Sequence, residues 1–374
     1  MKRRWLYLLG ASSVAGYAAW RAASRPPRPG APELLLEGRE RFGEDRGRGC
    51  LLAVQPFLLP VDYASEESFT AKLEGYLDEA ARAGFLGPRS VVVLPAHLGT
   101  WLVTVDEGRR VYSAPTFERA MALTVASNLG RYVTELFPLE GGDPFSAALF
   151  RAKATRMADV YGRSLGGLAR RYGVTLVGGS LLLPSPDVVD GRLVAGRKAL
   201  REVTAVFGPD GRAVAPLSVK SSLEPDERGF VEAGQVSEPG VYETPAGRLG
   251  VLVGRDAFQP LAYAALRARE VDLVATPAYL SGKSAWTSSW PGYLGDAPPD
   301  ANRHDFGRLL EAEAWQRYGL AGRLREAGAK AGAASFFRGA LWDRRADGAA
   351  LVVAGEQAHQ GPLVSGASLT CLWL

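Results

Sequence analysis

Short apolar runs that end at glycine or proline alternate along this chain with longer segments in which apolar residues recur at helical spacing. Runs of this kind are typical of strands buried on both faces of a sheet, and they span residues 50–54, 90–94, 174–177, 249–253 and 272–276. Helical spacing, which gathers apolar residues on one face, extends over residues 66–83, 116–137, 145–172, 260–270 and 302–327. This alternation predicts a domain of the α/β class.

Two further pairs of apolar runs are separated by turn signals. Residues 201–207 and 213–217 flank a Gly-Pro-Asp-Gly sequence, and residues 333–337 and 349–353 are late strands around an Asp-Gly pair. Such spacing favours antiparallel hairpins. The sheets are therefore predicted to be mixed.

The segment 247–256 passes abruptly from a strand pattern to a helical one. A strand that turns directly into a helix presents the residue at the turn to a pocket, and enzymes often carry a nucleophile there. In this chain the residue at the turn is Gly254, which has no side chain. The turn is therefore a candidate site that lacks the expected chemistry.

The first 48 residues differ from the rest. Three basic residues at 2–4 precede an uncharged run over 5–20, and arginines and prolines follow. As a helix this run would reach roughly 24 Å, less than the ~30 Å hydrocarbon core of a bilayer. Residues 1–24 are interpreted as an export signal or a membrane anchor, with a soluble helix as the alternative. Both main interpretations place the protein at the cell envelope. Residues 25–48 are predicted to be a polar linker, and residues 49–374 the folded domain.

Composition excludes several classes of function. The 374 residues are 47% hydrophobic and 22% charged with a net charge of +4, and the basic residues are scattered apart from the N-terminal three. We therefore expect a sizeable core and no nucleic-acid partner. Cys50 and Cys371 are expected to be isolated thiols, with a single bridge between them as the alternative. The three histidines have no metal-ligand spacing, so neither a metal nor a cofactor is predicted.

Four blocks of the chain, in this order, resemble the carbon–nitrogen hydrolase (nitrilase) superfamily over roughly residues 49–355. The blocks are 91–95, 172–180, 207–212 with 219–220, and 249–256 with 272–277. The resemblance implies a four-layer α-β-β-α sandwich with mixed sheets. It also implies a homodimer, because members of the family commonly pair.

The family hydrolyses amides and nitriles with a cysteine, a glutamate that moves a proton and a lysine that stabilises the intermediate. Carried over by position, the lysine is Lys220, whereas Ala96 stands at the glutamate position and Gly254 at the cysteine position. A covalent hydrolase without its nucleophile keeps at most ~10³–10⁴ over the rate in water. The resemblance therefore implies a catalytically degenerate protein that binds a small ligand or a protein partner. The alternative is an active hydrolase that uses a non-standard nucleophile, with chemistry built on Lys220, His97 and Asp256.

A buried lysine rarely persists without a partner. Glu224 or Glu227 could pair with Lys220, and Glu227 is the nearer match to a second glutamate that the family often places after the lysine. Lys220 would then form a structural ion pair, although a ligand-facing role stays open. Arg255 and Asp256 follow the turn, where the resemblance implies a structural ion pair.

Two other features could belong to a pocket. His97 follows the glutamate position and could replace the base, but in an extended chain a one-residue offset would turn its side chain away. The loop 278–300 is rich in aromatic residues and could wall a pocket or simply pack. The aromatic residues concerned are Tyr279, Trp286, Trp290 and Tyr293.

Overall fold

The computed structural model describes residues 26–137, 142–295 and 297–374. The predicted signal or anchor at residues 1–24 lies outside these residues. None of the helices within the described residues combines the length and the apolar character needed to cross a membrane.

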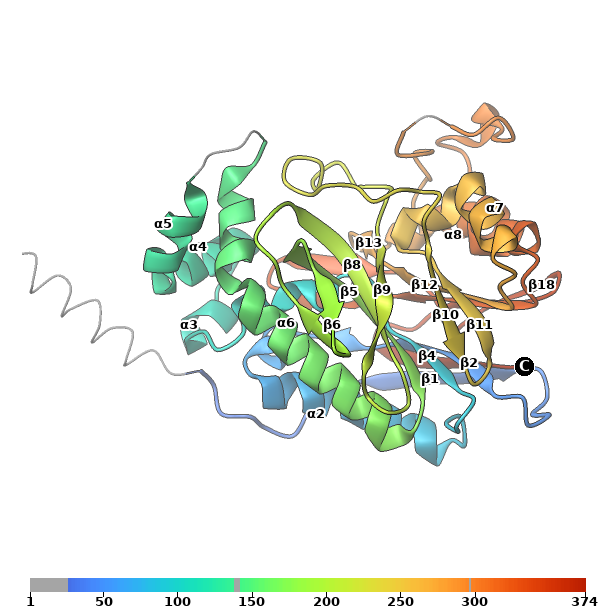
Figure 1. The fold of residues 1–374 in the computed structure, drawn as a ribbon, viewed down its shortest axis with the longest axis horizontal. Coiled ribbons are helices and arrows are strands. Elements are labelled where there is room, and N and C mark those ends of the chain that lie inside the picture. The colour runs from blue at the N-terminus through green and yellow to red at the C-terminus, as the bar shows by residue number, and fades with distance from the viewer. Residues whose placement is uncertain (1–25, 138–141, 296) are drawn as a thin grey trace, which may run out of the picture.

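Two large sheets form the centre of the molecule (Figure 1). One has seven strands in the order β1-β19-β2-β4-β5-β8-β9, and the other has six in the order β10-β11-β12-β14-β17-β18. The strands of the first are β1 (Leu36–Phe42), β19 (Ala367–Trp373), β2 (Cys50–Gln55), β4 (Val91–Val93), β5 (Thr175–Pro184), β8 (Leu200–Phe207) and β9 (Ala213–Val219). Those of the second are β10 (Gly240–Thr244), β11 (Gly247–Val251), β12 (Leu273–Ala278), β14 (Ala331–Phe336), β17 (Leu351–Ala354) and β18 (Gln357–Gln360).

A continuous apolar layer joins the two sheets, since β-branched and aliphatic side chains from both pack together. It includes Val91, Val93 and Val177 from the first sheet and Leu249 and Val251 from the second. Burial of such residues on both faces of a strand explains the uninterrupted apolar runs in the sequence.

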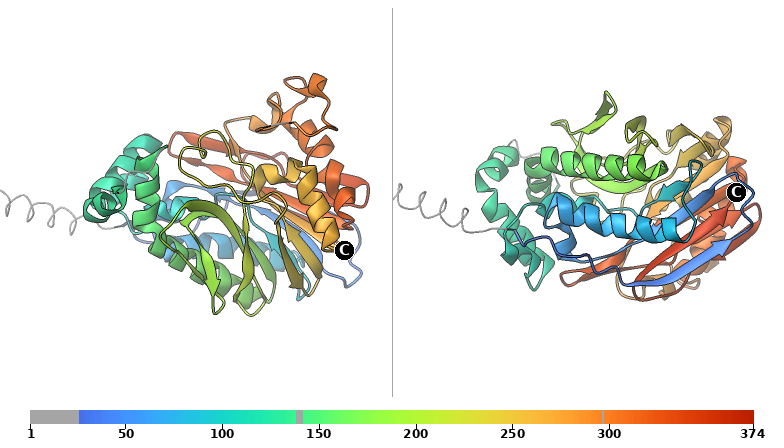
Figure 2. Two further views of the ribbon diagram at one scale, coloured as in Figure 1. Left: turned by 45° about the horizontal axis from the view of Figure 1, so that its top comes forward. Right: turned by 90° about the horizontal axis from the view of Figure 1, so that it is seen from below.

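Helices cover the two outer faces. α2 (Glu66–Arg82) and α6 (Pro144–Tyr172) lie side by side over the seven-stranded sheet (Figure 2). α7 (Pro260–Ala268), α8 (Glu311–Arg317) and α9 (Leu320–Arg323) pack on the six-stranded sheet. The four layers therefore run α-β-β-α, as predicted, and both sheets contain parallel and antiparallel pairs.

Smaller elements complete the fold. Three short helices lie together at one end of the molecule (Figure 1). They are α3 (Arg109–Tyr112), α4 (Phe117–Ser127) and α5 (Leu129–Leu136), and α5 packs against α6. A four-stranded sheet contains β13 (Leu280–Ser281), β16 (Arg344–Asp347), β15 (Arg338–Leu341) and β3 (Phe57–Leu58), and a two-stranded sheet contains β6 (Asp187–Val189) and β7 (Arg192–Val194). Single 3₁₀ turns are η1 (Pro60–Tyr63), η2 (Thr100–Thr104), η3 (Gly254–Phe258), η4 (Ala285–Thr287), η5 (Arg303–Asp305) and η6 (Leu324–Ala327).

Four elements differ from those that the sequence predicts. Part of the predicted linker is β1, which pairs in parallel with β19 and is polar because much of it faces solvent. β5 does not end at residue 177 but continues through a bulge at its two glycines. The helices predicted over 116–137 and 302–327 are each divided into shorter pieces.

The two cysteines are free thiols. Cys50 begins β2 and Cys371 lies in β19, on adjacent strands of one sheet. The bridge considered from the sequence is not present between them.

Candidate functional site

Lys220 directly follows β9 and is held inside the protein by two carboxylates. Its Nζ lies 2.8 and 2.9 Å from the two carboxylate oxygens of Glu227, and 2.9 Å from Oε2 of Glu202. Only 3% of Lys220 is exposed. The predicted ion pair between Lys220 and Glu227 is confirmed, because a buried ammonium needs compensating charge.

Glu202 was not identified from the sequence. It lies on β8, is fully buried, and accepts a hydrogen bond from the hydroxyl of Ser180 on β5. The only signal for it is a carboxylate within a mostly apolar strand that also contains Arg201 and Thr204. A charged residue at such a position needs a partner across the sheet.

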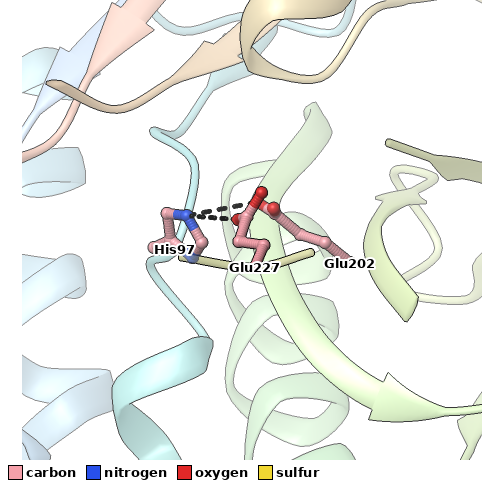
Figure 3. A group of neighbouring side chains, drawn as sticks. All are labelled: His97, Glu202 and Glu227. Atoms are coloured by element: carbon pink, nitrogen blue, oxygen red, sulfur yellow. Dashed lines mark ion pairs between the residues drawn. The ribbon is translucent and has the colours of Figure 1, made fainter. Parts of the chain in front are cut away.

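His97 also reaches this cluster, so the expectation that its side chain turns away is wrong. Its Nε2 lies 3.3 Å from Oε1 of Glu227 and 3.6 Å from Oε1 of Glu202 (Figure 3). The expectation assumed an extended chain, whereas His97 has a positive φ of 57°. Residues other than glycine rarely adopt this left-handed backbone conformation. Here it turns the imidazole of His97 toward the cluster. Nδ1 lies 3.1 Å from the hydroxyl of Thr100.

The four groups shift one another's protonation. Burial alone would lower the pKa values of Lys220 and His97, but the nearby carboxylates outweigh burial and raise both. Burial would raise the pKa of Glu227, but its contacts with His97 and Lys220 lower it overall. For Glu202 burial prevails over the same two cations, so its pKa is raised. Two acids and two basic groups thus form one buried cluster whose charges offset one another.

Gly254 lies beside this cluster at the start of η3, with a φ of 57°. A Cβ atom at this position would lie 3.6 Å from Cε and 4.0 Å from Nζ of Lys220. A side chain there would therefore point at the lysine, as the resemblance implies for the nucleophile position. Ala96 is buried, and its N–H donates to the carbonyl of Ala278. Neither position supplies a reactive group.

The thiols of Cys50 and Cys371 lie in the seven-stranded sheet, away from Lys220 and Gly254. Leu51, next to Cys50, pairs with Val91 at the beginning of β4, whereas the site follows the end of that strand. Cys371 pairs with Leu52. Neither thiol therefore lies at the site beside Lys220.

Asp256 has a structural role, although not the predicted ion pair with Arg255. Its carboxylate accepts hydrogen bonds from the N–H groups of Ser221 and Ser222 and from the Ser221 hydroxyl, at 2.7–3.1 Å. It thereby ties η3 to the segment that follows Lys220. Burial raises the pKa of Asp256, and these hydrogen bonds oppose that rise.

Arg255 pairs with other carboxylates. Its Nη1 lies 2.5 Å from Oε1 of Glu311, its Nε lies 3.7 Å from Oε1 of Glu224, and its guanidinium lies 5.0 Å from the ring centre of Phe258. Burial raises the pKa of Glu224, against the opposing effect of Arg255. These contacts hold the guanidinium in place at the wall of a cavity.

A cavity of about 630 Å³ opens above the cluster. Of the predicted pocket residues, His97, Glu227 and Arg255 line it, whereas Ala96, Gly254 and Asp256 do not. Its aromatic walls come from Trp101, Phe117, Phe150, Phe230 and Tyr279. Both possibilities for the aromatic loop are realised, because Tyr279 lines the cavity while Trp286 and Trp290 are buried in packing contacts.

Comparison with known proteins gives structural matches only. No protein-family model matches the sequence, and a search of curated proteins finds no match. A cysteine-to-alanine mutant of the Nesterenkonia AN1 amidase from the nitrilase superfamily matches with a TM-score of 0.54 and 16% identity, covering 87% of this chain and 90% of that chain.

Two further structures of Nesterenkonia amidases agree. One is a glutamate-to-glutamine mutant of the amidase from Nesterenkonia sp. AN1, in which acrylamide has added to the active-site cysteine. This structure matches with a TM-score of 0.53 and 16% identity, covering 86% of this chain and 91% of that chain. An amidase from Nesterenkonia sp. matches with a TM-score of 0.53 and 15% identity, covering 92% and 94%. The chain therefore has the fold of the nitrilase-superfamily amidases.

Proposed function

We propose that this protein binds a small ligand at the cell envelope without hydrolysing it. The observation that carries this proposal is an open cavity of about 630 Å³ over a buried lysine cluster, with Gly254 beside the lysine where a nucleophile would stand. In this proposal the pocket serves binding, because Ala96 and Gly254 stand where the resemblance places the glutamate and the cysteine of the covalent mechanism. Pockets of this size hold small molecules.

The charges of the cluster support binding rather than catalysis. A general base must lie within hydrogen-bond reach of the proton that it removes. The carboxylates of Glu202 and Glu227 are instead engaged by Lys220 at 2.8–2.9 Å and face His97. The groups that could move a proton therefore stabilise one another.

The walls of the cavity indicate the character of the ligand. Charged side chains, among them Arg255 and Glu224, and aromatic rings such as Trp101 and Phe230 line the cavity together. The guanidinium of Arg344 lies over the ring of Phe117 in the same lining. A ligand that carries both apolar and polar groups fits this mixed lining, because each part would meet a matching surface.

A binding and turnover experiment tests the proposal. Purified protein is incubated with a panel of amides, nitriles and carboxylic acids; binding is followed by calorimetry, and hydrolysis by mass spectrometry. We expect one or more compounds to bind without conversion, and Arg255→Gln to weaken binding while the exposed control Arg325→Gln does not.

Conversion of a panel compound by the wild-type protein would contradict the proposal. If that conversion disappears in His97→Ala, the alternative of a hydrolase with a non-standard nucleophile is favoured. Failure of every compound to bind would contradict the binding role.

Location at the envelope rests on the basic residues 2–4 and the uncharged run 5–20. Expression of the full chain and of a chain that begins at residue 26, followed by cell fractionation, tests it. We expect the full chain in the envelope or exported fraction and the shorter chain in neither.

A further inference from the structure

Three potential metal ligands meet at the floor of the cavity, although they are far apart in the sequence. His97 follows β4, Glu202 lies on β8, and Glu227 lies in the loop after Lys220. One ligand atom from each lies within 4.8 Å of the other two, and all three residues are largely or fully buried. Figure 3 shows the imidazole of His97 facing the two carboxylates.

The spacing of these atoms suits a small divalent ion. Ligands at ~2.0–2.1 Å from a tetrahedral ion lie roughly 3.3–3.4 Å from one another. Nε2 of His97 is 3.3 Å from Oε1 of Glu227 and 3.6 Å from Oε1 of Glu202. The imidazole nitrogen is thus placed where it could share an ion with both oxygens.

Hydrogen bonds from neighbouring residues orient the ligands. The hydroxyl of Thr100 lies 3.1 Å from Nδ1 of His97, and the hydroxyl of Ser180 donates to Oε1 of Glu202. A metal-binding histidine almost always uses its second nitrogen in such a contact, which leaves the first nitrogen's lone pair for the ion. The backbone N–H of His97 also donates to Ser180 at 2.7 Å.

Charge balance leaves room for a further cation. With neutral His97, two buried carboxylates outnumber the single ammonium of Lys220 by one negative charge. Lys220 contacts Oε2 of Glu202 and both oxygens of Glu227, while Oε1 of Glu202 accepts a hydrogen bond from the hydroxyl of Ser180. Either a proton on the imidazole or a divalent ion on the three atoms can offset the remaining charge.

We propose that His97, Glu202 and Glu227 bind one divalent transition-metal ion of the Zn²⁺ type. Imidazole and carboxylate ligands suit such an ion. His97 and Glu227 line the cavity while Glu202 is fully buried, so a fourth coordination position faces the cavity. With the ion bound, the cluster has one excess positive charge, which favours an anionic ligand group at that position.

Metal titration tests this site without any ligand of the cavity. Full-length protein freed of metal by chelation is titrated with Zn²⁺ by calorimetry and with Co²⁺ by visible absorption. We expect one equivalent to bind, the strong visible bands of four-coordinate Co²⁺, and proton release that grows as the pH is lowered.

Matched variants locate the ion. His97→Ala should weaken binding more than about 100-fold, and Thr100→Val should weaken it about 10- to 100-fold, as for other residues that orient a ligand. His359→Ala removes a histidine that stacks on Phe42 elsewhere and should bind as the wild type does.

Binding below one equivalent, a weak six-coordinate Co²⁺ spectrum, or unchanged affinity in both His97→Ala and Thr100→Val would overturn the site. The Thr100 variant decides the question if His97→Ala does not fold. None of these outcomes depends on the ligand-binding role proposed above, so the two proposals can fail separately.

Discussion

The two large sheets contribute very different residues to the same site. The end of the seven-stranded sheet supplies His97, Glu202 and Lys220, all with charged or titratable side chains. The matching end of the six-stranded sheet supplies Gly254, which contributes no side chain. The charged side chains of this site and the turn beside them therefore come from different sheets.

Stability explains why the two parts can differ in this way. Each charged residue of the cluster compensates another, so removal of one leaves a buried charge without a partner. Gly254 has no side chain and takes no part in this compensation. The burial of Lys220 is thus explained by a stable ion cluster and does not require a role in catalysis.

The largest expected effect comes from the charged side of the comparison. Lys220→Met removes the ammonium and leaves Glu202 and Glu227 buried close together, which should cost about 3–5 kcal/mol of unfolding free energy. Urea unfolding measures it. Lys330→Met is the control, because Lys330 pairs with Asp272 but its side chain is 81% exposed, and it should cost about 1 kcal/mol or less. Equal effects in the two variants would show that the cluster is not what holds this part of the fold.

The next largest effect is expected at Asp256, which connects the turn at Gly254 to the segment that follows Lys220. Asp256, two residues after Gly254, accepts hydrogen bonds from three donors. They belong to Ser221 and Ser222, which directly follow Lys220. Asp256→Asn places an NH₂ group against backbone N–H groups and should cost about 1–3 kcal/mol. Asp210→Asn is the matched control, since Asp210 accepts from one N–H at an exposed turn. Thermal unfolding of both variants measures the difference, and a shift no larger than that of the control would contradict this role.

Much of the fold could be predicted from the sequence because buried positions carry apolar residues at the spacing of the strand or helix to which they belong. The strands β2, β4 and β11 and the helices α2 and α6 are recognisable for this reason. β1 was interpreted as linker because an edge strand with much of its length in solvent has a polar pattern. Periodicity reports burial, so it fails where a strand is exposed.

The site was predictable only in part. The pair of Lys220 and Glu227 followed from the need of a buried lysine for a partner close in sequence. Glu202 is not predicted because a register shift between the neighbouring strands β8 and β9 brings Lys220 opposite it. The prediction for His97 is wrong because its left-handed backbone conformation leaves no mark in the sequence. Contacts made by tertiary structure and by unusual backbone angles were beyond what the residue pattern could show.

A smaller effect is expected at Gly254, the residue that the six-stranded sheet contributes to the site. Gly254→Ala should cost about 1–2 kcal/mol, because a φ of 57° is unfavourable for any residue with a Cβ. The added atom meets Lys220 only at ordinary contact distance. Gly173→Ala is the control, with a φ of 61° and no neighbour within 4 Å of the added atom. Similar costs in urea unfolding are expected, and a much larger cost at Gly254 would mean that this position is closed to a side chain.

The smallest effect comes from a carboxylate that also has two cationic partners but lies near the surface. Glu66 on α2 accepts hydrogen bonds from Arg163 at 2.8 Å and from Arg156 at 3.0 Å, both on α6. The hydrogen bond from Arg163 is the main reason that the pKa of Glu66 is lowered, and burial only partly opposes it. A folded-state pKa below the unfolded value of ~4.3 adds stability above that pH, and this contribution is lost as the pH falls through the folded-state pKa. Glu66→Gln should therefore cost less than about 1 kcal/mol at neutral pH and progressively less in acid, since solvent screens the pair. Urea unfolding at pH 7 and below pH 4 measures both values. A cost at Glu66 equal to that of Lys220→Met would mean that the composition of an ion cluster, and not its burial, sets its contribution to stability.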